Sequence, residues 1–398
     1  THTAFKIASW NVAGLRGLLR KEGANVLQEF CTTYQLDMLC LQETKLQELH
    51  VEDPKLNFRT GLIPGYTSYW SCSTTKKGYS GTCVFIKEPP HQQQQSEPKD
   101  RSNNPTSNKH RNTKTSIIDP ALLVPTKIDY TLGDPQIDDL NEGRYIAVTF
   151  PWATITNVYV PNSGQNLQRL QYRTEIWDPI FGTCMRQQQQ QLQKNEGSSS
   201  SNISGGTTTL HPVIWLGDLN IAHQSYDIWN DGAKHLSKQA GVTEQERASF
   251  THQLRTGNRY SGHEDKNDNQ DEDDDATAAA ADMFVDVFRR LHPNAKGNYS
   301  YWSQRAGNRI PNKGLRLDYF IASNTIMAND DIVTTTTTTT TTSNNSNDDD
   351  YDDDDGSSRK TSTANTKVNV IARDSYMIMD QMGSDHAPVI LELELKEN

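Results

Sequence analysis

Apolar runs that end in polar, chemically active side chains are the feature that most constrains this chain. The run 213–217 is almost wholly apolar and is followed by Asp218 and, two residues later, Asn220. Side chains two apart in an extended segment point to the same side, so Asp218 and Asn220 are expected together at one sheet edge. Other apolar runs also carry polar residues at one end. Asn11, Glu43, Tyr159 and Asn162 follow such runs, whereas Asp318, Asp385 and His386 precede them. So many polar strand ends have little structural use and predict a catalytic site.

The negative charge of the chain is concentrated in two segments. The formal net charge is −11 over 398 residues. Segments 262–281 and 343–356 together hold fifteen acids and one Lys, a charge of −14, so the rest of the chain carries +3. A slightly basic body is compatible with binding to phosphates. No apolar run approaches the roughly 20 residues of a membrane-spanning helix, so no membrane partner is expected.

The number and spacing of the cysteines indicate the redox environment of the protein. There are five cysteines, an odd number, and none form a C-x-x-C pair. This pattern argues against a disulfide framework and against a zinc site, and it favours a reducing compartment.

Four low-complexity segments interrupt the apolar pattern, at 89–127, 186–209, 262–281 and 334–366. Their Gln-, Asn-, Ser-, Thr- and Asp-rich composition cannot bury enough apolar surface to offset the entropy lost on ordering. We expect them to be disordered insertions in a single domain that spans 1–398.

The segments between these insertions alternate between strand and helix patterns. Helical spacing of apolar residues is found at 24–34, 166–180, 244–254 and 282–291. Thr243 with Glu246 three residues later is typical of a capping box at the start of a helix. Paired apolar strands with helices outside them predict an α/β sandwich.

Eight motifs in order identify a family resemblance. The motifs are SWNVAGLR at 9–16, LQETK at 41–45, GYSG at 78–81, EGR at 142–144, YVPN at 159–162, GDLN at 217–220, GLRLDYF at 314–320 and GSDHAP at 383–388. Any one motif is weak, but eight at compatible spacings are specific. With them the chain resembles the exonuclease III type of apurinic/apyrimidinic (AP) endonucleases, in the endonuclease/exonuclease/phosphatase superfamily, from Phe5 to Leu393 apart from the insertions.

The resemblance implies a fold, an activity and a location. It implies a four-layered α/β sandwich of the DNase I-like type, in which two packed mixed β-sheets are flanked by helices. It implies Mg²⁺-dependent hydrolysis of the phosphodiester 5′ to an abasic site in duplex DNA, with Mn²⁺ as a substitute ion. It further implies action on blocked 3′ ends and a monomeric protein. The expected location is the nucleus, with the mitochondrion or cytoplasm as alternatives.

Roles for the polar strand ends follow from what phosphodiester hydrolysis needs, namely an oriented water, a proton acceptor and positive charge on the phosphate. Glu43 is the best candidate Mg²⁺ ligand and Asp385 the second, since Mg²⁺ prefers oxygen. Asp218 is expected to orient or deprotonate the water. The other catalytic candidates are Asn11, Tyr159, Asn220, Asp318 and His386, and the other metal candidates are Asn11, Asp218, Asn220 and His386. Asn162 is expected to contact the DNA, and Asp318 is expected to hold the His386 imidazole.

Damage recognition is expected from a tight pocket for a baseless sugar, with Tyr301 and Leu315 as wall residues and Trp302 in the core. The candidates for phosphate binding are Arg16, Lys45, Lys76, Lys77, Arg144, Arg169 and Arg173. Ala13 departs from the family pattern, which usually has Asp or Asn there, and this predicts weaker metal binding.

The sequence leaves two other functions open. One is an enzyme of the same fold that acts mainly as a 3′–5′ exonuclease or cleans 3′ ends. The other is a protein that binds abasic DNA and turns over poorly because Ala13 weakens its metal site.

Overall fold

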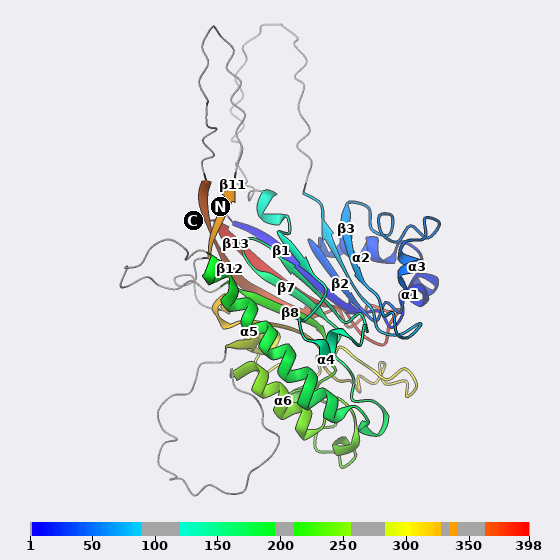
Figure 1. Cartoon of the computed structure of the whole chain (residues 1–398). Helices are drawn as coiled ribbons and strands as arrows, with labels where there is room; N and C mark the ends of the chain where they lie inside the picture. The colour runs from blue at the N-terminus through cyan, green and yellow to red at the C-terminus, as the bar shows by residue number, and fades with distance from the viewer. Residues whose placement is uncertain are drawn as a thin grey trace, which may run out of the picture.

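The fold consists of two mixed β-sheets packed face to face, with helices on their outer faces (Figure 1). The computed structural model describes residues 2–89, 120–195, 211–255, 283–327, 335–340 and 363–397. The arrangement confirms the predicted four-layered α/β sandwich of the DNase I-like type.

The first sheet has the strand order β11-β12-β13-β1-β2-β4-β3. At its centre, β1 pairs with β2 in parallel and with β13 in antiparallel register, so the first and last described strands lie side by side. Its strands are β1 (His2–Asn11), β2 (Met38–Gln42), β3 (Tyr66–Ser71), β4 (Thr82–Lys87), β11 (Thr335–Thr340), β12 (Thr363–Met377) and β13 (Val389–Glu397).

The second sheet has the strand order β5-β6-β7-β8-β10-β9. Its central strand β8 pairs with β7 in parallel and with β10 in antiparallel register. Its strands are β5 (Lys127–Asp129), β6 (Tyr145–Thr149), β7 (Thr154–Val158), β8 (Val213–Asp218), β9 (Phe284–Asp286) and β10 (Asp318–Ser323).

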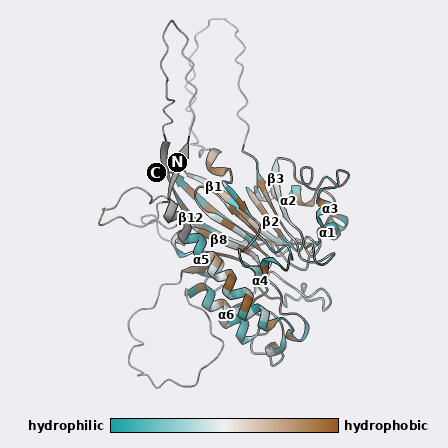
Figure 2. Ribbon diagram, viewed as in Figure 1, coloured by the Kyte–Doolittle hydropathy of each residue, from teal (hydrophilic) through white to brown (hydrophobic). Residues whose placement is uncertain are grey.

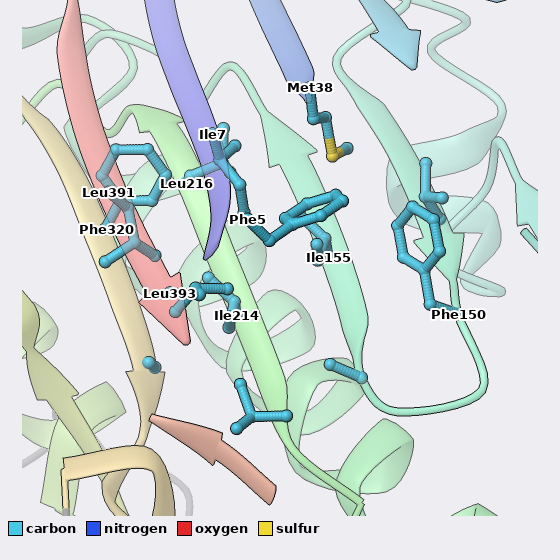
Figure 3. Close-up of a cluster of buried hydrophobic side chains, with 14 of the residues drawn as sticks. Phe5, Ile7, Met38, Phe150, Ile155, Ile214, Leu216, Phe320, Leu391 and Leu393 are labelled. Carbon is cyan, nitrogen blue, oxygen red and sulfur yellow. The ribbon is translucent and has the colours of Figure 1, made fainter. Parts of the chain in front are cut away.

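The main hydrophobic core lies between the two sheets. Phe5, Ile7 and Met38 of the first sheet meet Ile155 and Leu216 of the second, all of them buried (Figure 3). Figure 2 shows hydrophobic stretches along β1, β2 and β8, whereas the outer helices carry residues of both kinds. Burial on both faces explains why these strands are continuous apolar runs, and their ends are where polar side chains become available.

Helices cover the outer faces of both sheets. The first sheet is covered by α1 (Leu15–Glu22) and α2 (Val26–Tyr34), and the second by α5 (Asp178–Asn195) and α6 (Glu244–Arg255). No helix within the described ranges is both long enough and apolar enough to cross a membrane. The shorter elements are α3 (Glu48–Val51), α4 (Pro135–Asp138), α7 (Val287–Leu291), the 3-10 turns η1 (Pro120–Leu123), η2 (Gln165–Leu167), η4 (Ser225–Asp227), η5 (Leu236–Lys238) and η6 (Asn324–Met327), and the π-helical segment η3 (Tyr172–Trp177).

Of the predicted helix features, one capping box is confirmed and one helix is wrong in part. The capping box is confirmed, since the Glu246 backbone N–H donates to Thr243 Oγ1 (3.2 Å) and the Thr243 N–H donates to Glu246 Oε2 (3.2 Å). The helix predicted over 282–291 is wrong in its first half. Residues 284–286 form β9 instead, and Asp286 then caps the N-terminus of α7 by accepting from the Arg289 N–H. Pairing with β10 therefore outweighs the helical spacing.

The ends of the predicted insertions belong to regular elements. Residues 186–195, expected in an insertion, continue α5, and residue 127 begins β5. Residues 335–340 and 363–366 lie in β11 and β12, which pair with each other and so extend the first sheet. The remaining parts of the four segments, 90–119, 196–209, 262–281, 334 and 341–362, lie outside the described residues.

Candidate active site

The polar strand ends surround one cavity of about 610 Å³. The sheets bring them together because β1, β2, β8 and β10 are the central strands of the two sheets and pack against one another. The residues predicted from sequence that line this cavity are Glu43, Tyr159, Asn162, Asp218, Asn220, Tyr301, Leu315, Asp385 and His386.

Asn11 joins the two sheets at this cavity. Its Nδ2 donates to Glu43 Oε1 (2.9 Å) and to Asp218 Oδ2 (2.9 Å), and its Oδ1 accepts from the Ala13 N–H (2.9 Å). An amide whose atoms are all used in this way holds two carboxylates in place. Asn11 thus connects the candidate metal ligand Glu43 to the candidate base Asp218.

Asp218 and Asp318 face each other across neighbouring strands. They are direct register partners in the pairing of β8 with β10. Asp218 Oδ1 accepts from the Asn220 N–H (2.9 Å). Burial raises the pKa of Asp218 to about 7, the carboxylates of Asp318 and Glu43 add to the rise, and His386 opposes it. Asp218 is thus able to exchange a proton near neutral pH.

His386 is bound to Asp318 in the interior. Its Nδ1 lies 2.7 Å from Asp318 Oδ2, and its Nε2 lies 3.9 Å from Asp218 Oδ2. Burial disfavours the charged ring, but the carboxylates of Asp318 and Asp218 outweigh burial and raise the pKa of His386 to about 10. A charged imidazole has protons on both nitrogens, so in the metal-free site His386 can donate hydrogen bonds.

The loop that carries His386 is fastened to the end of β1. The Ser384 hydroxyl donates to the Asn11 carbonyl oxygen (2.7 Å), and the Trp10 indole N–H donates to the His386 carbonyl oxygen (3.2 Å). Trp10 is fully buried, which agrees with its assignment to the core.

Tyr159, Asn162 and Asn220 form the next part of the wall. Asn220 donates to the Val160 carbonyl oxygen (2.8 Å) and accepts from Asn162 Nδ2 (2.8 Å), so both ends of its amide are hydrogen-bonded. Burial and the Glu43 carboxylate raise the pKa of Tyr159 well above 10, against the effect of Arg144. Its hydroxyl therefore keeps its proton and can donate to a phosphate oxygen.

Several residues at the site have left-handed backbone conformations. The φ values are 51° for Glu43, 54° for Lys45, 50° for Asn220 and 49° for Ala13. Such values are uncommon outside Gly, Asn and Asp, and they cluster at functional sites.

The basic candidates separate into surface and interior groups. Arg16, Lys76 and Lys77 are exposed, and Lys45 is partly exposed with its Nζ 2.9 Å from Glu43 Oε2. Arg169 is partly exposed and donates to the Tyr79 hydroxyl (2.8 Å).

Two of the predicted phosphate-binding arginines are buried. Arg173 forms an ion pair with Asp178 (2.7 Å) and donates to backbone carbonyl oxygens. Arg144 stacks over the Tyr159 ring and donates to the Tyr159 carbonyl oxygen (3.0 Å). A guanidinium enclosed by protein partners cannot reach DNA, so both expectations are corrected to structural roles.

The two residues expected in the wall of the pocket lie at the cavity. Tyr301 and Leu315 line the cavity, and the Tyr301 ring lies 4.9 Å from the His386 ring. Trp302 is buried, as expected for a core residue. His223 lies outside this cavity, where its ring packs on Phe250 and its Nε2 lies 2.7 Å from Thr251 Oγ1.

One acidic cluster has the proximity that metal binding requires. Ligand atoms of Asp218, Asp318 and His386 all lie within 4.8 Å of one another. Glu43 and Asp385 line the same cavity as Asp218 and His386.

Sequence reasoning missed the residues at the far side of the cavity, which include Trp229, Asn230, His235 and Lys313. None of them ends an apolar run, so they gave no signal of the kind that found the others. A Trp in a stretch otherwise rich in polar residues was the available signal.

The chain is similar in sequence and in structure to known proteins. The protein-family model described as Endonuclease/Exonuclease/phosphatase family matches residues 8–386 of this chain. The chain is 31% identical over 323 residues to an exodeoxyribonuclease of Bacillus subtilis, which covers 81% of this chain and 89% of that protein. It is 29% identical over 318 residues to recombination repair protein 1 of Drosophila melanogaster, covering 80% of this chain but only 33% of that longer protein. The crystal structure of an AP endonuclease from Leishmania major superimposes with a TM-score of 0.60 at 25% identity, covering 98% of this chain and 87% of that one.

Proposed function

Because the chain belongs to the endonuclease/exonuclease/phosphatase family, we propose that it is a DNA repair enzyme that hydrolyses the phosphodiester 5′ to an abasic site in duplex DNA. The observation that carries this proposal is one cavity that combines two kinds of wall. Asp218, Tyr159 and His386 supply polar chemistry, whereas Tyr301 and Leu315 supply an apolar surface. A baseless sugar fits against an apolar wall where an intact nucleotide would have to accommodate its base.

The side chains supply the elements of phosphodiester hydrolysis. Asp218, with a pKa of about 7, accepts a proton from the attacking water. The charged ring of His386, held by Asp318, stabilises the negative charge that develops on the phosphate. The protonated Tyr159 and the amide of Asn162 donate to the other phosphate oxygens.

The donor set suits Mg²⁺ as the cofactor, with Mn²⁺ as a substitute. Mg²⁺ prefers oxygen ligands and keeps several waters, and Glu43, Asp218 and Asp385 offer carboxylate oxygens to one cavity. The Lys45 ammonium already lies 2.9 Å from Glu43 Oε2, so this carboxylate is oriented to receive a cation. When bound, Mg²⁺ supplies positive charge to the phosphate.

The proposed substrate is duplex DNA with abasic sites or blocked 3′ ends, acted on by a monomer. Arg16, Lys76 and Lys77 are exposed and can contact phosphates. The five cysteines are unpaired, which agrees with a reducing compartment, and we propose the nucleus as the location.

A 3′–5′ exonuclease or 3′-phosphodiesterase activity of the same site is the second candidate. The observation that favours it is the similarity to the Bacillus subtilis exodeoxyribonuclease. The same oriented water can attack a terminal phosphodiester, so the two activities differ in substrate rather than in chemistry.

Cleavage of a duplex that contains one synthetic abasic site, with and without Mg²⁺, tests the proposal. The expected product is a single nick 5′ to the lesion with a 3′-hydroxyl, formed only with the metal. A recessed 3′ end and a 3′-phosphoglycolate end are run in parallel. Degradation of the ends without nicking would favour the second candidate, and binding without any cleavage would leave an abasic-DNA binding protein.

A further inference from the structure

We propose that Trp229, backed by Lys313, is a stacking platform for the nucleobase that flanks an abasic site on the damaged strand. The proposal rests on the proposed function, because it assigns a second recognition element to the same cavity. Both residues line the cavity, and the Lys313 ammonium lies 5.1 Å from the centre of the Trp229 ring.

The exposure of Trp229 is exceptional for this protein. All seven Trp residues fall within the described ranges, and the six with buried side chains are Trp10, Trp70, Trp152, Trp177, Trp215 and Trp302. Trp229 is 43% exposed. A large apolar ring held at the mouth of a polar cavity gains stability only when something covers it, which suggests a ligand with an aromatic face.

The position of Trp229 is fixed by the same backbone that forms the cavity wall. Its N–H donates to the Gly314 carbonyl oxygen (3.2 Å), and its neighbour Ile228 forms a β-bridge with Leu315. Leu315 bridges Tyr301 in turn, and Tyr301 bridges His386. A continuous series of backbone pairings therefore connects Trp229 to the imidazole of the active site.

Buried charges make this connection rigid. Asp227, two residues before Trp229, is fully buried and receives two hydrogen bonds from the Arg316 side chain, at 2.8 and 3.0 Å. The Arg316 N–H also donates to the Asp227 carbonyl oxygen (2.9 Å). An aromatic side chain on such an anchored segment is preorganised, so stacking on it costs little conformational entropy.

The chemistry of an abasic site explains why a base would stack there. In an intact duplex both faces of each base are covered by its neighbours. Loss of one base leaves the adjacent base with an uncovered face, and Trp229 can cover that face while Lys313 adds positive charge near the strand. Stacking of this kind would favour abasic over intact DNA without a contact to the missing base.

Fluorescence in metal-free buffer tests the platform on the uncleaved complex. Emission that differs between the wild type and the Trp229→Phe variant reports on Trp229, since the other indoles are buried. A duplex with a tetrahydrofuran abasic analogue should quench this emission and protect it from acrylamide, and an intact duplex should do neither. Replacing one of the two flanking nucleotides by a second abasic analogue should abolish the quenching and so show which base is bound.

Matched variants are compared by measuring DNA binding with fluorescence anisotropy. Trp229→Ala should weaken binding of the abasic duplex roughly tenfold, as expected for loss of one stacked base, and leave intact duplex unchanged. Tyr226→Ala is the control, because Tyr226 is also exposed and also carries a Lys over its ring but does not line the cavity. It should leave both affinities as they are.

Two results would overturn the platform. One is acrylamide-accessible Trp229 emission in a complex that anisotropy shows to be formed. The other is quenching that persists when both flanking nucleotides are abasic analogues. Failure of the proposed function is distinguishable, because it would appear as absence of Mg²⁺-dependent nicking by the wild-type protein whatever the state of Trp229.

Discussion

The imidazole of His386 lies 2.7 Å from the Asp318 carboxylate, and both side chains are buried. This pairing stabilises the charged ring in a place where burial alone would neutralise it. The pKa of His386 rises to about 10 as a result, so the ring carries its charge throughout the physiological range.

The first prediction is that Asp318→Asn lowers the pKa of His386 toward the ordinary value of about 6.5. Ring signals of His386 followed by NMR in metal-free protein should titrate near pH 10 in the wild type and at much lower pH in the variant. The raised pKa contributes stability that is complete below about pH 6.5 and is lost as the pH rises to about 10. The free energy of unfolding should therefore fall over this range in the wild type and fall less in Asp318→Asn. A variant whose His386 titrates like the wild type would show that Asp318 does not hold the charge.

Much of this site could be predicted from sequence, because buried strands leave a readable pattern. The polar residues at the ends of β1, β2 and β8 and at the start of β10 line the cavity or hold its side chains, such as Asn11, Glu43 and Asp218. What the pattern could not supply was burial in loops and helices. Arg173 and the exposed Arg16 look alike as charged helix residues, and only tertiary packing separates them.

Loop residues and register were likewise outside the reach of sequence. Trp229 lies beside the cavity because Ile228 bridges Leu315, a contact between segments almost 90 residues apart along the chain. The strand β9 was mistaken for helix because Phe284, Val285 and Phe288 have helical spacing. The hydrogen bonds that β10 offers to residues 284–286 decide the outcome, and no local pattern records them.

Asp218→Asn should abolish most incision while abasic DNA still binds. The change keeps the shape of the side chain but removes the proton acceptor, which is typically worth about 10²–10⁴-fold in rate. In the wild type the rate should rise with pH as Asp218, with a pKa of about 7, loses its proton. A bound divalent cation moves that midpoint to lower pH, because positive charge favours the carboxylate. Single-turnover rates with Mg²⁺ between pH 5 and 9 test this. A variant that cuts at the wild-type rate would remove Asp218 from this role.

Two arginines make a matched pair for separating stability from DNA binding. Arg173→Met leaves Asp178 buried without its partner, which should cost about 3–5 kcal/mol in the free energy of unfolding. Arg16→Met changes an exposed side chain and should alter stability by less than about 0.5 kcal/mol. It should instead weaken duplex binding at low salt. The slope of log affinity against log salt concentration should become shallower by about one. Denaturant unfolding and anisotropy titrations at several salt concentrations measure both effects. The reverse pattern would place Arg173, and not Arg16, on the DNA face.

Ala13 is predicted to be strained. Its φ of 49° is left-handed, which costs an ordinary L-residue roughly 1–2 kcal/mol and is tolerated best by Gly, Asn and Asp. Ala13→Asn should therefore raise the free energy of unfolding by about 0.5–1 kcal/mol, a part of that cost. Ala13→Val should lower it, since a β-branched side chain fits this conformation poorly. Equal unfolding curves for the three proteins would show that the backbone at this position relaxes freely.

A negatively charged side chain at position 13 is also expected to raise the affinity for Mg²⁺. The Ala13 N–H is hydrogen-bonded to the Asn11 amide that holds Glu43 and Asp218, so a side chain at 13 begins close to the oxygen donors. Ala13→Asp should lower the Mg²⁺ concentration needed for half-maximal incision, because one more carboxylate favours a cation directly or through its waters. The rate at saturating Mg²⁺ should change less.

Ala13→Asn is the matched control for this effect, because Asn shares the tolerance of Asp for a left-handed backbone and lacks its charge. A titration of incision against Mg²⁺ for the three proteins separates the two contributions. A shift in Ala13→Asp alone assigns the effect to charge near the ion. Equal shifts in both variants would instead assign it to relief of backbone strain, and superimposable curves would mean that position 13 has no influence on the ion.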